Sequence, residues 1–104
     1  MNSRVRFEDE ADAEYRSAGR WYEERRVGLG LEFFDEVDAA IGQVLDLPRA
    51  GERVRRMPAE LPVHCVAVKR FPYHVFYLEA PEELRILAVA HDRREPGYWK
   101  IRLR

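Results

Sequence analysis

The apolar residues of this 104-residue chain change their spacing about half-way along it. In the first half they recur every three or four residues, which is the period of an α-helix. After residue 62 they alternate or run together, as they do in β-strands. Helices are therefore expected in the first half and strands in the second. A chain that groups its helices and strands in this way is typical of the α+β class.

Two helices are predicted, over residues 8–26 and 31–47. Acidic residues from Glu8 to Glu14 crowd the start of the first helix, where the helix dipole favours negative charge, and they are interpreted as a solvated helix start. The apolar stripe of this helix consists of Ala11, Tyr15, Ala18 and Tyr22. Between the helices, Gly28 suits the left-handed residue that ends a helix, and Gly30 permits a tight reversal. So short a connection predicts an antiparallel helix hairpin.

Four strands are predicted, and three of them form an antiparallel meander. A short strand at residues 4–7 precedes the helices, and the meander follows at residues 63–70, 74–79 and 84–91. The last of these strands is apolar on both faces, so it is expected in the middle of the sheet.

The remaining segments are short. The loop at residues 48–62 has room for one further strand near residues 54–57, and the tail turns at Pro96 and Gly97 before a short helix or strand. The expected architecture is one domain, residues 1–104, with the helix hairpin packed on one face of the sheet. The first strand is expected to pair beside one of the last three.

The charged residues divide unevenly between the two halves. The chain carries 18 basic and 19 acidic side chains, for a net charge of −1. Residues 1–48 hold 6 of the basic and 12 of the acidic ones, and residues 49–104 hold 12 and 7. The total argues against a protein that coats nucleic acid, which would be strongly basic. The division still leaves room for a local anion-binding surface on the second half.

Several classes of protein and site are excluded or disfavoured. The chain contains no run of 18 apolar residues that could span a membrane. Its N-terminus lacks the apolar segment of a signal peptide. The single cysteine, Cys65, excludes a disulfide framework and lies in an apolar strand, where a buried inert thiol is expected. His64 and His74 lie on neighbouring predicted strands and could face each other, but they lack metal-ligand spacing. We expect no metal and no organic cofactor, and no standard catalytic motif is present.

Basic and aromatic residues gather in the second half of the chain. Guanidinium groups hold phosphates, and aromatic rings stack on bases. Arg70 ends one predicted strand and Arg93 follows another, so in a meander both could reach one rim of the sheet. Two interpretations stay open, a binding surface or solvated charges beside core aromatics. The group consists of Lys69, Arg70, Phe71, Tyr73, His91, Arg93, Arg94, Tyr98 and Trp99.

Three segments resemble signatures of the RelE/ParE toxin superfamily. They are WYEE followed by GLGLEF at residues 21–33, RFPYHVFY at residues 70–77 and AVAHDRREPGYW at residues 88–99. The resemblance runs from about residue 5 to residue 99 and includes the predicted order of helices and strands. It implies a RelE/ParE-like fold and the toxin of a bacterial type II toxin–antitoxin pair. Such toxins are cytoplasmic and form a hetero-oligomer with a cognate antitoxin.

The superfamily has two branches with different activities. RelE-like members are ribosome-dependent mRNA endoribonucleases, whereas ParE-like members inhibit DNA gyrase. The chain matches the nuclease residues at Arg70, Arg93 and Tyr98, but the stretch LPVHCVAV at residues 61–68 lacks their lysines. The residues of the last two segments resemble those of ParE-like proteins more than those of RelE-like proteins. The resemblance therefore favours a gyrase inhibitor that a cognate antitoxin neutralises. An endoribonuclease and an inactive binding module are the alternatives.

The resemblance also assigns candidate site residues. No residue is assigned a catalytic role unless the chain is a nuclease, in which case the three matched residues above would act. Candidate antitoxin anchors on the helix hairpin are Trp21, Leu29 and Phe33, for which simple core packing is the competing interpretation. The candidate target-binding residues are Arg70, Tyr73, His91, Arg93, Arg94, Tyr98 and Trp99.

Overall fold

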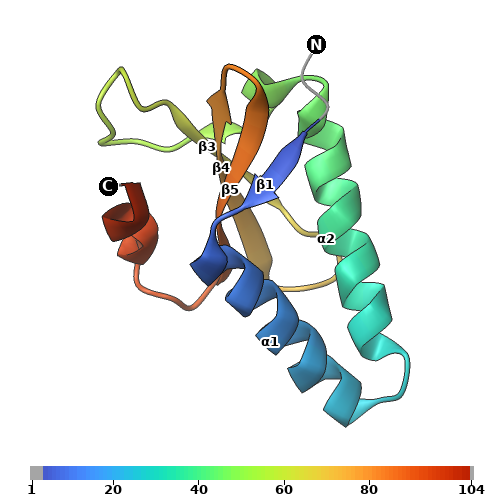
Figure 1. Ribbon diagram of the computed structural model, residues 1–104. Coiled ribbons are helices and arrows are strands. Elements are labelled where there is room, and N and C mark those ends of the chain that lie inside the picture. The colour runs from blue at the N-terminus through green and yellow to red at the C-terminus, as the bar shows by residue number, and fades with distance from the viewer. Residues whose placement is uncertain (1–3, 104) are drawn as a thin grey trace.

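A five-stranded mixed sheet carries two α-helices on one face in the computed structural model, which describes residues 4–103 (Figure 1). The strand order is β1-β5-β4-β3-β2, with β1 parallel to β5 and the other pairs antiparallel. The α+β class, the helix hairpin and the meander are therefore confirmed. In chain order the elements are β1 (Val5–Phe7), α1 (Asp9–Arg25), α2 (Leu29–Leu45), η1 (Pro48–Ala50), β2 (Glu52–Arg53), β3 (Val63–Ala67), β4 (Tyr73–Ala80), β5 (Glu83–His91) and η2 (Tyr98–Leu103).

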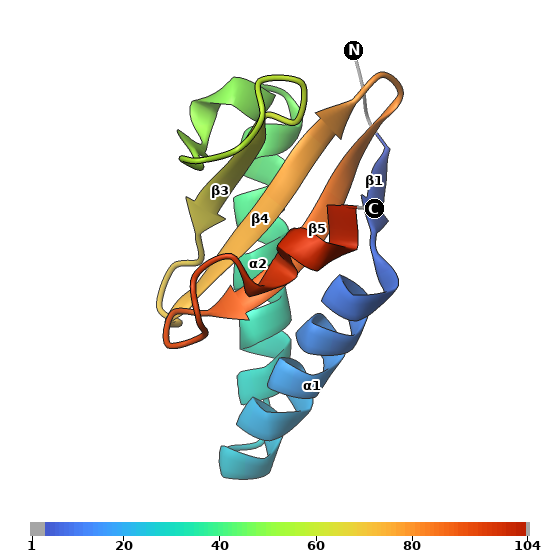
Figure 2. The same ribbon diagram turned by 90° about the vertical axis from the view of Figure 1, so that its left-hand side faces the viewer.

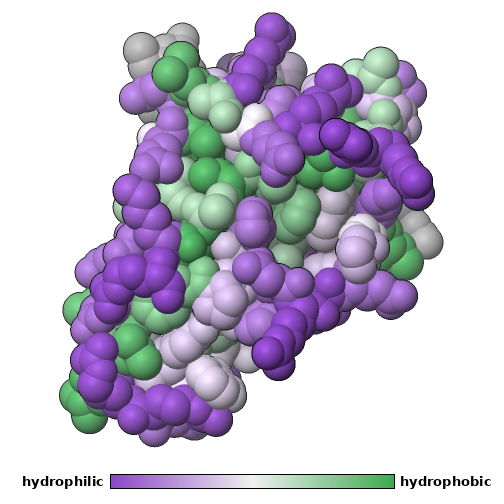
Figure 3. All heavy atoms as spheres, turned by 180° about the vertical axis from the view of Figure 1, so that it is seen from behind, coloured by the Kyte–Doolittle hydropathy of each residue, from purple (hydrophilic) through white to green (hydrophobic). Residues whose placement is uncertain are grey.

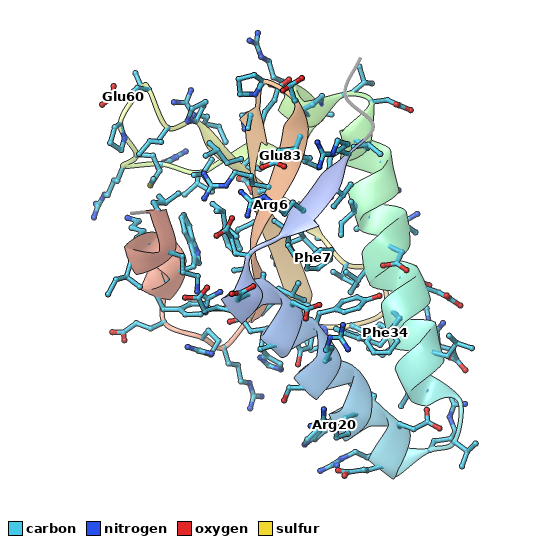
Figure 4. The ribbon with its side chains drawn as sticks, in the orientation of Figure 1. Arg6, Phe7, Arg20, Phe34, Glu60 and Glu83 are labelled. Atoms are coloured by element: carbon cyan, nitrogen blue, oxygen red, sulfur yellow. The ribbon has the colours of Figure 1, made fainter. Side chains whose placement is uncertain are left out.

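The predicted apolar stripe of α1 faces the sheet. Ala11 and Ala18 are buried, and Tyr15 and Tyr22 pack partly buried against the same core. In Figure 4, Phe7 of β1 lies toward the helices, and Phe34 of α2 lies between α2 and α1, where a Cβ atom on Gly19 would meet its ring. Tyr15 sits between them, with its ring centroid 5.3 Å from Phe7 and 4.4 Å from Phe34. The stripe therefore marks the face that the periodicity predicts.

The second helix begins two residues earlier than predicted, and the role assigned to Gly30 was wrong. Gly28 is left-handed, with φ of +90°, and α2 starts at Leu29 directly after it. A Cβ atom on Gly30 would lie 2.5 Å from the carbonyl oxygen of Gly19. Gly30 is therefore a point of close contact between α1 and α2, and Gly28 supplies the left-handed residue of the reversal.

Two strand boundaries also differ from the prediction. Strand β3 ends at Ala67 because the chain turns at residues 69–70, where Arg70 has φ of +69°. The short strand expected near residues 54–57 forms at Glu52–Arg53, where it pairs with β3. As predicted, β5 is an inner strand, and it lies between β4 and β1.

Each face of the sheet has its own core. One core lies between the sheet and the two helices, and the other lies beneath η2 and the loop that follows β2. Figure 2 shows η2 in front of the strands and α2 behind them. The tail therefore ends in a 3-10 helix that covers the outer face of the sheet. Within residues 4–103, none of the helices is both long and apolar enough to cross a membrane.

Candidate functional site

The two family arginines lie at one end of the sheet. Tyr73, the first residue of β4, pairs in register with His91, the last residue of β5. Arg70 precedes this pair in the β3–β4 turn, and Arg93 follows it. We call this end of the sheet, residues 69–73 and 91–94, the rim. The meander therefore brings both arginines to one rim, as the sequence indicates.

The side chain of Arg70 is directed to the helix hairpin. Its guanidinium lies 2.7 Å from the carboxylate of Glu32 and 3.7 Å from that of Glu36, both on α2. Glu32 also accepts two hydrogen bonds from Arg26, each 3.2 Å long. These contacts with Arg26, and then with Arg70, lower the pKa of Glu32. Arg70 therefore joins the β3–β4 turn to α2, and its charge is matched within the chain.

Glu32→Gln is expected to flatten the acid side of the stability profile. Because the pKa of Glu32 is lower in the folded chain, its stabilising effect is complete above the ordinary glutamate pKa and is lost as the pH falls through the lowered value. The wild type should melt above the variant at neutral pH, and the gap should close in acid. Melting curves across pH test this, with Glu24→Gln on α1 as an exposed control. A gap independent of pH would contradict it.

Glu14 of α1 binds side chains of the C-terminal segment of the chain. Its carboxylate accepts two hydrogen bonds from Arg102, at 2.9 and 3.0 Å, one from the hydroxyl of Tyr98 and one of 3.0 Å from the backbone N–H of Val89. Arg102 also donates to the carbonyl of Leu87. The side chains thereby satisfy edge groups of β5 beyond the end of β1. Sequence reasoning treated Glu14 as part of a solvated helix start, and this reading was wrong.

The hydroxyl of Tyr98 is held in this cluster. Burial, followed by the hydrogen bond to Glu14, raises the pKa of Tyr98. The guanidinium of Arg94 lies over the Tyr98 ring, 3.8 Å from its centroid. The Arg93 side chain is exposed, and its backbone N–H donates to Nδ1 of His91. The rim therefore presents the exposed cations Lys69, Arg93 and Arg94, of which Arg94 also lies 4.0 Å from the carboxylate of Glu14.

A cavity of about 300 Å³ opens between the outer sheet face and the loop after β5. Its floor includes Cys65 and Phe76, and His74 on its wall lies 2.7 Å from Asp92. Burial raises the pKa of the Cys65 thiol, which agrees with the predicted inert thiol. His74 and His64 do not face each other, because His64 pairs with Tyr77 and lies on the opposite sheet face. Among the described residues, no group of His, Cys, Asp and Glu could hold a metal ion.

One predicted contact residue is a core residue instead. Trp99 of η2 is 1% exposed, and its ring centroid lies 5.0 Å from that of Phe76 on the outer face of the sheet. The structure thus corrects its assignment to the target-binding set. The C-terminal segment folds back over the outer face of the sheet, and this buries the ring of Trp99.

One family model matches most of the chain. The family model described as "ParE toxin of type II toxin-antitoxin system, parDE" matches residues 5–96. The chain belongs to the ParE toxin family. A solved chain described as "Chromosomal ParDE TA system from P. aeruginosa" has the same fold, with a TM-score of 0.67 and 15% identity over 85% of this chain and 94% of that one. No curated protein matches the chain significantly.

The candidate antitoxin anchors of this ParE-family chain have different exposures. Trp21 is 51% exposed, Leu29 is half-buried, and Phe33 is fully buried in the core beneath the hairpin. Phe33 is therefore wrong as an exposed anchor. Sequence reasoning also missed Val27 and Leu31, which are 87% and 64% exposed. The sequence contains a signal for Val27, because an apolar residue in the turn between two helices lies away from the core and is expected to be exposed.

The exposed apolar residues define a surface at the end of the hairpin. We call Trp21, Val27 and Leu31 the hairpin-tip patch. In Figure 3 the hairpin tip, at the lower left, shows apolar spheres among polar ones. The ring of Trp21 is covered on one side by the guanidinium of Arg25, 3.5 Å from its centroid. The rim reaches the same part of the hairpin, because Arg70 contacts Glu32, the neighbour of Leu31.

Proposed function

We propose that this ParE-family toxin arrests growth by binding DNA gyrase, and that its cognate antitoxin neutralises it. The observation that carries the proposal is the state of the rim. Arg70 is paired with Glu32, and the Tyr98 hydroxyl is bound to Glu14. RNA cleavage needs a free group that moves a proton to the leaving oxygen and cations on the phosphate. With two of the three matched nuclease residues engaged in this way, and Arg93 exposed, this end of the molecule is better suited to binding a protein than to cleaving RNA.

The target-binding surface that we propose consists of the rim residues that remain accessible. Arg93 and Arg94 supply the charge, while Tyr73 and His91 form a half-buried aromatic pair with ring centroids 5.0 Å apart. Exposed arginines beside aromatic rings are the residues that most often dominate protein interfaces. Under this proposal the chain acts in the cytoplasm, where its target and antitoxin are made.

The proposal is tested by inducing the chain in bacteria that lack its antitoxin. Growth should stop and a reporter plasmid should lose negative supercoils, while primer extension should find no new cuts in translated mRNA. Arg93→Ala should weaken the arrest, whereas Arg16→Ala, an exposed arginine on α1, should leave it intact. Cuts in ribosome-bound mRNA with unchanged plasmid topology would contradict the proposal and favour the endoribonuclease. Normal growth would favour an inactive binding module.

We also propose that the antitoxin covers the hairpin-tip patch. Antitoxins of this type fold on the toxin, and an apolar helix face is a common way to cover exposed apolar residues. The resulting complex is a toxin–antitoxin hetero-oligomer. The expected partner is the product of the neighbouring open reading frame.

Leu31→Ser is expected to weaken antitoxin binding by about tenfold or more, because it removes exposed apolar area from the patch. Leu47→Ser provides a matched control, since Leu47 is 67% exposed at the other end of α2 and Leu31 is 64% exposed. Calorimetric titration of the antitoxin into each variant measures the difference. Equal affinities for the two variants would remove the hairpin-tip patch as the antitoxin site.

A further inference from the structure

The loop between α2 and β3 carries four arginines that the functions above do not use. We call residues 48–62 the arginine loop, after Arg49, Arg53, Arg55 and Arg56. All four side chains are exposed, and within residues 4–103 none of them forms an ion pair. This contrasts with Arg6, Arg26 and Arg70, each of which contacts a carboxylate. Their charge is therefore available to a ligand.

A buried tyrosine fixes the part of the loop that carries the first two arginines. The hydroxyl of Tyr77 donates to the carbonyl of Pro48 and accepts a hydrogen bond of 3.2 Å from the N–H of Gly51. Tyr77 is fully buried, and a Cβ atom on Gly51 would lie 2.2 Å from its hydroxyl. Arg49 and Arg53 flank this clamped point. The loop segment thus has a defined position before any ligand arrives, which lowers the entropic cost of binding.

Three cationic or potentially cationic side chains border one cavity beside this clamp. The cavity has a volume of about 350 Å³ and is lined by Arg49 of η1, Arg53 of β2 and His64 of β3, with Glu79 at its edge. Arg53 and His64 are cross-strand partners. The His64 ring stacks on that of Tyr77, with centroids 5.9 Å apart and an angle of 22°. Side chains from three elements therefore border one cavity.

The site is distinct from the rim. His64 pairs with Tyr77 beyond the middle of β4, and Glu79 follows near the end of that strand. The rim lies where β4 begins, at Tyr73. The loop extends away from the sheet in Figure 4, where Glu60 marks its outer part. A ligand on the arginine loop would thus leave the rim open.

We propose that the arginine loop binds the phosphate backbone of duplex DNA. One guanidinium group can donate two parallel hydrogen bonds to a phosphate. Arg55 and Arg56 continue the cationic surface beyond the cavity. One small anion would not use them, but successive phosphates would. Residues 48–62 include no Phe, Trp or Tyr, so the loop has no ring on which unpaired bases could stack. This favours a duplex over a single strand.

The outward side of the loop also suits DNA better than an acidic protein. The apolar residues Val54, Met57 and Leu61 pack against the core beneath η2, so they are not presented as anchors to a protein partner. Glu52 and Glu60 reduce the charge of residues 49–61 to +2. Recognition that depends on so few phosphate contacts is expected to be weak at high salt and to carry no base sequence preference.

The test is fluorescence anisotropy of a labelled duplex of arbitrary sequence with the purified chain. With three to four phosphate contacts, the logarithm of the binding constant should fall with a slope of about −3 against the logarithm of the salt concentration. Arg49→Gln with Arg53→Gln should reduce the magnitude of that slope by about two. Arg20→Gln is the matched control, because Arg20 is an exposed arginine on α1 without an ion pair among residues 4–103 (Figure 4). Melting curves of all variants verify that they are folded.

The possible results separate the proposal from its competitors. A slope that the double variant reduces and the Arg20 variant leaves unchanged would support it. It would be overturned by the absence of salt-dependent binding, or by an equal loss in the Arg20 variant. Competition by polyglutamate as strong as that by unlabelled duplex would instead assign the loop to an acidic protein, and displacement by inorganic phosphate alone would assign it to a small anion. None of these results depends on gyrase.

Discussion

Trp99→Ala is expected to lower the free energy of unfolding by about 3–5 kcal/mol, the usual cost of removing a large aromatic side chain from a core. The ring of Trp99 is 1% exposed and packs on Phe76, so its loss leaves a cavity on the outer face of the sheet. Urea unfolding measures the change. Small domains of this size usually unfold in one step, so a single transition is expected.

Trp21→Ala is the matched control for this experiment. Trp21 is 51% exposed at the hairpin tip, and its removal should cost no more than about 1 kcal/mol. If Trp99 were a surface contact for the target, the two variants would be equally stable and only Trp99→Ala would lose growth inhibition. That result would contradict the burial of Trp99 between η2 and the outer face of the sheet.

Glu14→Gln is expected to cost about 2–4 kcal/mol, because it leaves the guanidinium of Arg102 without a carboxylate. Arg102 has only 10% of its side chain exposed, so water cannot fully replace that carboxylate. The substitution keeps the shape of the side chain and removes its charge. It should also loosen η2, which the Glu14 contacts to Tyr98 and Arg102 fasten to α1.

Two measurements test the role of Glu14. Urea unfolding gives the stability, and hydrogen exchange at the backbone N–H of Val89, which donates to Glu14, should become faster. Glu10→Gln, an exposed carboxylate one turn earlier on α1, should change neither quantity by much. Unchanged exchange at Val89 in the Glu14 variant would show that the cluster is not what secures this edge of β5.

Local patterns predicted much of the fold. The stripe that includes Ala11 and Ala18 identified the buried face of α1, because helix periodicity depends only on neighbouring turns. The apolar run of the last strand identified β5 as an inner strand, because a strand that is apolar on both faces is covered on both. Gly30 shows the limit of such reasoning. A glycine needed for a close helix contact and one needed for a turn look alike in a sequence.

The candidate site depended on contacts between distant parts of the chain. Arg102 lies 88 residues from Glu14, and Arg70 lies 38 residues from Glu32. No spacing rule links such pairs, so the sequence could place Arg70 and Arg93 at one rim but not tell which was paired. The burial of Trp99 was hidden in the same way, since it follows from where the tail folds. The family, by contrast, was readable from short segments, and the match over residues 5–96 confirmed it.

The central claim is that this ParE-family chain inhibits DNA gyrase through the rim. The most direct measurement is ATP-dependent supercoiling of relaxed plasmid by purified gyrase with increasing amounts of the purified chain. Supercoiling should fall as the chain is added, should recover when the antitoxin is supplied, and should be less affected by Arg93→Ala than by the wild type. Full supercoiling at a large excess of folded wild-type chain would contradict the claim.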